Sequence, residues 1–127
     1  MENKAKNDNE LQLIPKSEKY IQYVIEMINK LPRVEKFSIG SEYKTSMYQM
    51  LKNIMYLSKI DMNKRFSIIN IIDADLNSQR IYLRIMYKNR WIDSKKFNVA
   101  IEMIYEMGKI IGGLVKYYAK YNKKWIL

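Results

Sequence analysis

The sequence predicts an all-α fold, an antiparallel four-helix bundle, and three observations support this class. The chain has 127 residues, close to the usual size of one domain, so we expect one hydrophobic core. Hydrophobic residues make up 48% of it, whereas Gly and Pro number only 4 and 2, too few for the turns of an all-β fold. Four segments repeat apolar residues at three- and four-residue spacing, as amphipathic helices of a bundle do.

The polar residues 1–15 form a predicted flexible arm in front of a bundle domain of residues 16–127. Ser17 is the predicted N-cap of the first helix. Pro32 disfavours helical geometry at Leu31 and therefore ends this helix. The apolar face of the helix consists of Ile21, Val24, Ile25 and Ile28.

The segment from Leu31 to Gly40 is a predicted connector to the second helix. This helix has an apolar face of Tyr43, Met47, Met50, Leu51 and Ile54. The pattern lapses around residues 58–63, and a third helix is predicted from about Lys64 to Trp91. Its apolar face consists of Ile69, Ile72, Leu76, Leu83 and Met86. Ser94 is the predicted N-cap of a fourth helix that extends past Tyr117.

The fourth helix carries two apolar rows with alternating four- and three-residue steps. The first row consists of Phe97, Ile101, Ile104, Gly108, Ile111, Val115 and Tyr118. The second row consists of Met103, Met107, Ile110, Leu114, Tyr117 and Tyr121. One row is enough for the core of a monomer, so we expect the second to form the interface of a homo-oligomer. The alternative is a helix buried on both sides within one bundle.

The third helix repeats this pattern more weakly, because some of its apolar residues lie away from its core side. These residues are Ile71, Tyr82 and Ile85. They add to the expectation of self-association.

Lys and Arg together number 23 against 13 for Asp and Glu, which gives a formal net charge of +10. Such an excess attracts polyanions such as RNA or DNA, although solubility or a Lys-rich codon usage would explain the charge equally well. The chain has no Cys and no His, which excludes disulfides, Cys nucleophiles, imidazole general bases and the usual zinc sites. We therefore expect no enzyme, no metal site and no cofactor.

The N-terminal stretch is polar and mixed in charge, unlike a signal or transit peptide. The longest apolar runs fall far short of the ~20 residues that span a bilayer. From these two features we expect a cytoplasmic protein that does not enter membranes.

In the third helix, Arg80, Arg84 and Lys88 follow one another at four-residue steps and lie on one stripe. An Arg side chain matches phosphate oxygens with two parallel donors, so this stripe is a candidate nucleic-acid contact. A buried structural ion pair is an equally good interpretation for Arg80.

Lysines continue along the end of the fourth helix, interleaved with aromatic residues. They are Lys109, Lys116, Lys120, Lys123 and Lys124. Lysines that reach phosphates beside aromatic rings are typical of a nucleic-acid surface, and complementation of the helix dipole is the alternative. Gly112 and Gly113 lie inside the same helix, where they would permit a close helix approach or a kink.

Three segments resemble motifs of a bacterial four-helix-bundle family. The connector Leu31 to Gly40 resembles its Leu-Pro-Arg, basic-Phe and apolar-Gly signature. Arg80 to Arg84 resembles the pair of Arg in its third helix, and Glu106 to Leu114 resembles the end of its fourth helix. The chain is thus similar to the family that includes the accessory variability determinant (Avd-like) proteins of diversity-generating retroelements. A sister group comprises proteins encoded by intervening sequences in bacterial large-subunit ribosomal RNA genes.

The resemblance implies a homopentamer with a basic surface that binds a reverse transcriptase and its template RNA and assists mutagenic synthesis of complementary DNA. The implied basic contacts are Arg33, Lys36, Arg80, Arg84 and Lys109. The residues implied to shape the bundle, with Pro32, are Phe37, Gly40, Gly108, Gly112 and Gly113. A ribosomal RNA intervening-sequence protein and a purely structural interaction module remain the alternative functions.

Overall fold

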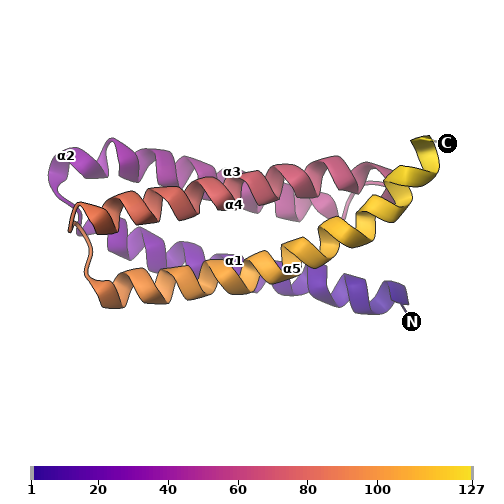
Figure 1. The fold of residues 1–127 in the computed structure, drawn as a ribbon, viewed down its shortest axis with the longest axis horizontal. Helices are drawn as coiled ribbons and strands as arrows, with labels where there is room; N and C mark the ends of the chain where they lie inside the picture. Colours follow the sequence, from indigo (N-terminus) through magenta and orange to yellow (C-terminus); the bar gives the residue numbers. More distant parts are fainter. Residues whose placement is uncertain (1, 127) are drawn as a thin grey trace.

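The structure contains helices and no strand in the part of the chain that it describes (Figure 1). It is a computed structural model that describes the backbone of residues 2–126 and the side chains of residues 9–122. Two short elements are α2 (Arg33–Lys36) and the 3₁₀ turn η1 (Met62–Lys64). The four long helices are α1 (Glu2–Asn29), α3 (Ile39–Leu57), α4 (Arg65–Lys88) and α5 (Ser94–Ile126). The predicted all-helical class is confirmed.

The four long helices lie alongside one another in an elongated bundle (Figure 1). α1 packs against α3 and α5, and α4 packs against the same two helices. α2, the C-terminal end of α4 and the start of α5 lie at one end of the bundle, while α1 begins and α5 ends at the other. Within the described residues, no helix is both long and apolar enough to cross a membrane.

The apolar faces predicted for the first three helices form the core. Their buried members are Ile21, Val24, Ile28, Tyr43, Met47, Met50, Ile54, Ile69, Ile72, Leu76, Leu83 and Met86. Ile25 and Leu51 are half-buried and pack at the edge of this core. A period of 3.6 residues therefore identified the buried faces, because each helix has one side toward the middle of the bundle.

α1 begins well before the predicted helix start. Ser17 is fully buried inside the helix and does not cap it, and the helix passes through Pro15. Leu13 is also fully buried, so the turn before Pro15 packs into the core. The prediction of a helix start at Ser17 is therefore wrong. The flexibility of residues 1–15 stays a prediction, and the side chains of residues 1–8 lie outside the described part.

A partly buried ion pair holds the turns of α1 that precede Pro15. Arg65 Nη1 lies 2.7 Å from Glu10 Oε1, and Arg65 Nε donates to the backbone oxygen of Ile60 at 3.1 Å. The Tyr118 hydroxyl donates to the same Glu10 oxygen. These contacts join α1, α4 and α5 at one end of the bundle. They stabilise helical turns that a proline would otherwise weaken by removing a backbone donor.

A buried chain of hydrogen bonds joins α1, α3 and α4 inside the core. The Tyr20 hydroxyl donates to Gln79 Oε1 at 2.9 Å, so the Tyr43 hydroxyl, 2.8 Å away, donates to Tyr20. Gln79 Nε2 donates to Ser46 Oγ at 3.1 Å. Burial raises the pKa of both tyrosines, which keeps their hydroxyls protonated at neutral pH. The network is satisfied as a unit, and it fixes how the three helices align.

α5 is apolar on two sides, and this chain's own helices cover both. Met107, Leu114 and Tyr117 of the second row are buried within the single chain. For Leu114 and Tyr117 the predicted oligomer interface is therefore wrong, because α1 and α4 of the same chain pack against α5, whereas for Met107, which also lines a groove between α1 and α5, it stays a prediction. The remaining members of the row are partly buried, and for them an interface stays a prediction. They are Met103, Ile110 and Tyr121.

The connection between α4 and α5 caps both helices. α4 ends at Lys88, three residues before the predicted end. The cap of α5 is Asp93 and not Ser94, because Asp93 Oδ1 accepts the backbone N–H of Lys96 at 2.8 Å. A carboxylate in this position satisfies one free donor of the first turn.

We predict that Gln79→Ala lowers the free energy of unfolding by about 2–4 kcal/mol. The substitution leaves a cavity and removes the partner of Tyr20 and Ser46. Gln22→Ala is the matched control, since Gln22 is exposed and its amide donates to Glu26 within α1. Urea unfolding measures both variants. Equal stability of the two would show that the buried network does not contribute.

Candidate nucleic-acid interface

The surface between α4 and α5 brings together cations from two of the predicted motifs. Arg80 of α4 and Lys109 of α5 line one groove, which we call the α4–α5 groove, together with Asp73, Asn77 and Tyr105. Because α4 and α5 pack directly against each other, motifs that are far apart in the sequence share this surface (Figure 1). The groove is therefore the candidate site.

Arg80 carries a charge that no carboxylate in the described part of the chain neutralises. Its Nη1 donates to the neutral Asn77 Oδ1 at 2.6 Å. Described residues form two ion pairs, and neither includes Arg80 or Asp73, although Asp73 lines the same groove. The interpretation of Arg80 as part of a buried ion pair is therefore wrong. Asn77 instead orients the guanidinium, which lines the groove.

Lys109 lies over an aromatic ring. Its Nζ is 5.0 Å from the centroid of Tyr105, one turn earlier on α5, within the range of a cation–π contact. Tyr105 is 56% exposed, so its ring is available to a ligand. Tyr105 was not among the predicted site residues, although its four-residue spacing from Lys109 could have indicated the pair.

Other predicted contacts extend from the groove along both helices. Four of them are exposed: Arg84, Lys88, Lys116 and Lys120. Arg84 lies one turn beyond Arg80, whereas Lys88 is at the C-terminal end of α4. Lys123 and Lys124 lie outside the residues whose side chains are described, so their role stays a prediction.

The basic residues of the connector lie apart from this groove. Arg33 and Lys36 are the first and last residues of α2, at one end of the bundle (Figure 1). Arg33 is exposed and Lys36 is half-buried. The three motifs therefore do not form one continuous site, since only those of α4 and α5 meet.

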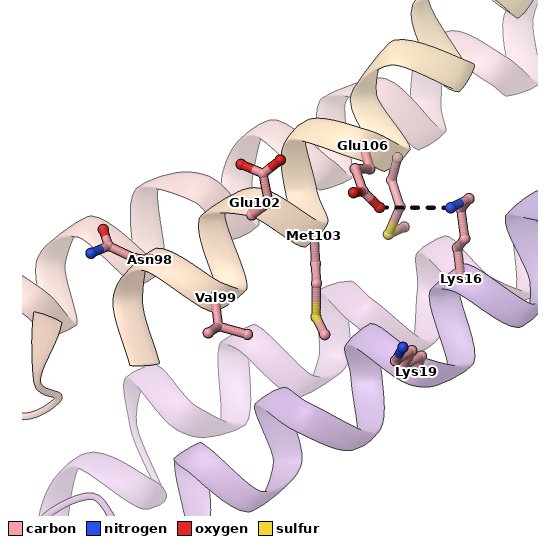
Figure 2. A pocket seen from close by; sticks show the side chains of 8 residues that line it. Lys16, Lys19, Asn98, Val99, Glu102, Met103 and Glu106 are labelled. Atoms are coloured by element: carbon pink, nitrogen blue, oxygen red, sulfur yellow. Dashed lines mark ion pairs between the residues drawn. The ribbon is translucent and has the colours of Figure 1, made fainter. Parts of the chain in front are cut away.

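A second groove, the α1–α5 groove, runs along another side of the bundle (Figure 2). Val99 and Met103 of α5 point toward α1, and two members of the second apolar row, Met103 and Met107, line this groove. The ion pair between Lys16 Nζ and Glu106 Oε2, 3.6 Å apart, crosses the groove (Figure 2). The other lining residues are Lys19, Asn98 and Glu102. An apolar floor with charged edges suits a helix of a protein partner.

Comparison with known proteins gives the family. A family model described as bAvd-like matches residues 11–118. The chain belongs to the bAvd-like family. The match spans the connector motif, the α4–α5 groove and most of all four long helices, and it confirms the resemblance that the three motifs indicate. No curated protein and no solved structure matches the chain.

Two residues of the connector shape the fold of this bAvd-like chain as predicted. A Cβ atom at Gly40 would lie 2.8 Å from Ile28 Cγ2 and 3.1 Å from the backbone oxygen of Glu35, so only glycine lets α3 begin this close to α1. Pro32 precedes α2 with φ of −52° and ψ of 143°, which is extended geometry after the end of α1.

Other residues predicted to shape the bundle have no such role within the chain. Phe37 is 75% exposed and does not enter the core. Added Cβ atoms at Gly112 and Gly113 would meet nothing within 4 Å, so the predicted close helix approach is wrong here, and the alternative, a kink, stays a prediction. At Gly108 a Cβ would lie 3.8 Å from Arg80 Nη2, an ordinary contact. Gly112 and Gly113 therefore lie in open surroundings, and Gly108 lies beside the side chains of Arg80 and Leu76. The backbone of another helix does not come close to any of the three.

These distances predict opposite effects of alanine at two glycines. Gly40→Ala forces Ile28 or the α2 backbone to move and lowers the free energy of unfolding by about 1–3 kcal/mol. Gly113→Ala fills open space and raises it by about 0.5–1 kcal/mol, because alanine favours helix. Thermal and urea unfolding at low protein concentration test both. A destabilising Gly113→Ala would contradict the open surroundings of this residue.

Proposed function

We propose that this chain is a non-enzymatic accessory protein that binds nucleic acid through the α4–α5 groove. In this proposal it serves a diversity-generating retroelement, where it binds the reverse transcriptase and the template RNA and supports mutagenic synthesis of complementary DNA. Membership in the bAvd-like family supports the accessory role. The charge of the groove supports the nucleic-acid contact.

The observation that carries the proposal is a pair of unneutralised cations from two helices. Arg80 and Lys109 line one groove, and neither takes part in the ion pairs of the described residues. Asp73 also lines the groove but forms an ion pair with neither cation, so a phosphate in the groove would be attracted by both. The protein then releases counterions from the nucleic acid, which is the main source of affinity for a polyanion.

The groove offers contacts for the backbone of a strand more than for base edges. Arg80 supplies a planar donor pair, Lys109 a point charge and Tyr105 an exposed ring on which a base can stack. Such contacts bind single strands of many sequences. We therefore expect affinity to depend on salt more than on sequence.

We further propose that the antiparallel four-helix bundle is the protomer of a homo-oligomer, a pentamer by resemblance to the Avd-like proteins. Its outer face on α4 supports this, because five residues at alternating three- and four-residue steps form an exposed ridge of apolar and small side chains. The α4 ridge consists of Ile71, Ala74, Ser78, Ile81 and Ile85. Tyr82, expected on the same side, instead packs 5.8 Å from the Tyr43 ring.

The α4 ridge and the α1–α5 groove suit each other in a head-to-tail assembly. They are formed by different helices, the ridge by α4 and the groove by α1 and α5. Val99 and Met103 give the groove an apolar floor (Figure 2). In this proposal, the α4 ridge of a second copy covers that floor. When two different surfaces of one protomer meet in this way, repetition closes a ring if the rotation fits.

We predict that replacing Arg80, Arg84 and Lys109 by Gln weakens binding of the retroelement's template RNA. Three lost phosphate contacts on a single strand lower the slope of log affinity against log salt by about 2. Fluorescence anisotropy at several salt concentrations measures this slope, and circular dichroism checks that the helices are retained.

The matched control for this variant removes the same charge elsewhere. Lys52, Lys59 and Lys64 are exposed and lie outside the groove, so their replacement by Gln leaves most of the slope in place. Equal slopes for the two triple variants would refute the groove as the site. If the parent protein does not bind RNA, the alternative function of a purely structural interaction module is favoured.

For the assembly we predict that Ile81→Glu with Ile85→Glu gives monomers that keep their helicity. Both side chains are exposed in the protomer, at 47% and 39%, so the charges disturb only a contact between copies. Met55→Glu with Tyr56→Glu on α3 is the control, because these residues are equally exposed but lie off the ridge. Sedimentation velocity measures the size. A parent protein that sediments as a monomer would overturn the proposed ring.

A further inference from the structure

A basic hollow lies where α4 passes to α5, at the end of the bundle that carries α2 (Figure 1). It has a volume of about 550 Å³, within the size range of small-ligand sites. Four cations and two aromatic residues line this end hollow: Lys30, Lys88, Arg90, Lys96, Tyr87 and Trp91. Of these, only Lys88 was a predicted contact. The hollow is separate from the α4–α5 groove, with which it shares no residue.

The cations of the end hollow lack carboxylate partners. Asp93 also lines it, but its Oδ1 accepts the backbone N–H of Lys96 as the cap of α5. None of the four cations takes part in an ion pair of the described residues. The hollow therefore holds an excess of positive charge, although Asp93 lowers it.

Arg90 occupies a backbone conformation that favours glycine. Its φ is +61°, and the chain around it forms the hydrogen bonds of a Schellman ending: Trp91 N–H to Met86 O and Arg90 N–H to Tyr87 O, both 3.0 Å. Glycine is the usual residue at this position because a side chain is strained there. The chain thus keeps an arginine at some cost to its own stability.

Lys96 is a second locally unfavourable choice at the same hollow. It lies in the first turn of α5, which contains no acidic residue, and the positive end of the helix dipole repels a cation there. Lys30 and Lys88 have another explanation, since cations near the C-terminal ends of α1 and α4 stabilise those helices. This explanation covers neither Lys96 nor the arginine at positive φ. Violations of local preference that converge on one surface are typical of a binding site.

We propose that the end hollow binds the terminal phosphate monoester of a nucleic-acid strand. A monoester carries nearly two negative charges at neutral pH, against one for each internal phosphate, so it suits a hollow lined by four cations and one carboxylate. Trp91 and Tyr87 also line the hollow, and one face of Tyr87 stacks on Phe97, so the terminal nucleoside packs against Trp91 or the other face of Tyr87. The inference rests on the proposed nucleic-acid function and adds to it a preference for phosphorylated ends.

The test compares three RNA strands of one sequence, about 12 nucleotides long, with a 5′ phosphate, a 3′ phosphate or hydroxyl groups at both ends. We expect the parent protein to bind one phosphorylated strand about tenfold more tightly than the hydroxyl strand. Arg90→Gln and Arg90→Gly both reduce this ratio to near one. Arg90→Gly alone also raises the melting temperature by about 3–5 °C, because glycine removes the strain at positive φ.

Two controls separate this inference from the proposed function. Replacing Arg80 and Arg84 by Gln weakens binding of all three strands and keeps their ratio, and Lys59→Gln at the other end of the bundle keeps the ratio as well. Equal binding of the three strands by the parent protein would contradict the phosphate site in the end hollow, but not the nucleic-acid site in the α4–α5 groove. The same conclusion would follow if both Arg90 variants kept the preference for the phosphorylated strand. If the strands bind alike but a free nucleoside monophosphate quenches tryptophan fluorescence, the assignment to a strand end is wrong.

Discussion

The surface of this protein depends on one constraint, which is that α5 is buried along two sides. α1 covers the side of Met107 and Leu114, and α4 covers the side of Gly108. The polar residues of α5 are thereby confined to the remaining strip, in which Lys109 is the first lysine after the carboxylates Glu102 and Glu106. Lys109 lines the groove beside α4 together with Arg80. A helix with one apolar face would have spread the same charges over a wider and more solvated surface.

The buried chain of hydrogen bonds fixes the orientation of α4, the helix that contributes Arg80 to the α4–α5 groove. Gln79 is held by Tyr20 of α1 and Ser46 of α3, and Arg80 is the next residue of α4. Consecutive residues of a helix differ by about 100° in direction, so fixing Gln79 toward the core places Arg80 at the boundary with α5. An apolar core alone would tolerate small rotations of α4, whereas specific hydrogen bonds do not. The fold thus orients the guanidinium from within.

The spacing of apolar residues predicted which helix faces are buried. It did not predict features that depend on which other segment a residue contacts. Periodicity gave the buried faces of α3 and α4 because a repeat of 3.6 residues reports direction. It could not tell whether the row through Met107 and Leu114 faces a subunit or α1, since both environments are apolar. The start of α1 was predicted too late because Pro15 removes a backbone donor from the helix. The contact between Glu10 and Arg65, 55 residues apart in sequence, stabilises the turns before Pro15, and no local pattern indicates it. Arg90 was missed because arginine gives no signal for a positive φ.

The stripe of α4 relates the two basic surfaces to each other. From Arg80 to Lys88 the helix rises by about 12 Å at 1.5 Å per residue, with Arg84 midway. A stacked strand advances about 3.4 Å per nucleotide, so this length corresponds to three or four nucleotides. A strand whose terminal phosphate occupied the end hollow would therefore pass Arg84 and reach the α4–α5 groove within its first few nucleotides. Joint occupancy makes the second contact intramolecular, and affinity then exceeds that of either surface alone. The four-residue spacing of Arg80, Arg84 and Lys88 is thus compatible with the proposed strand along α4, whereas a single phosphate site would need only one of them.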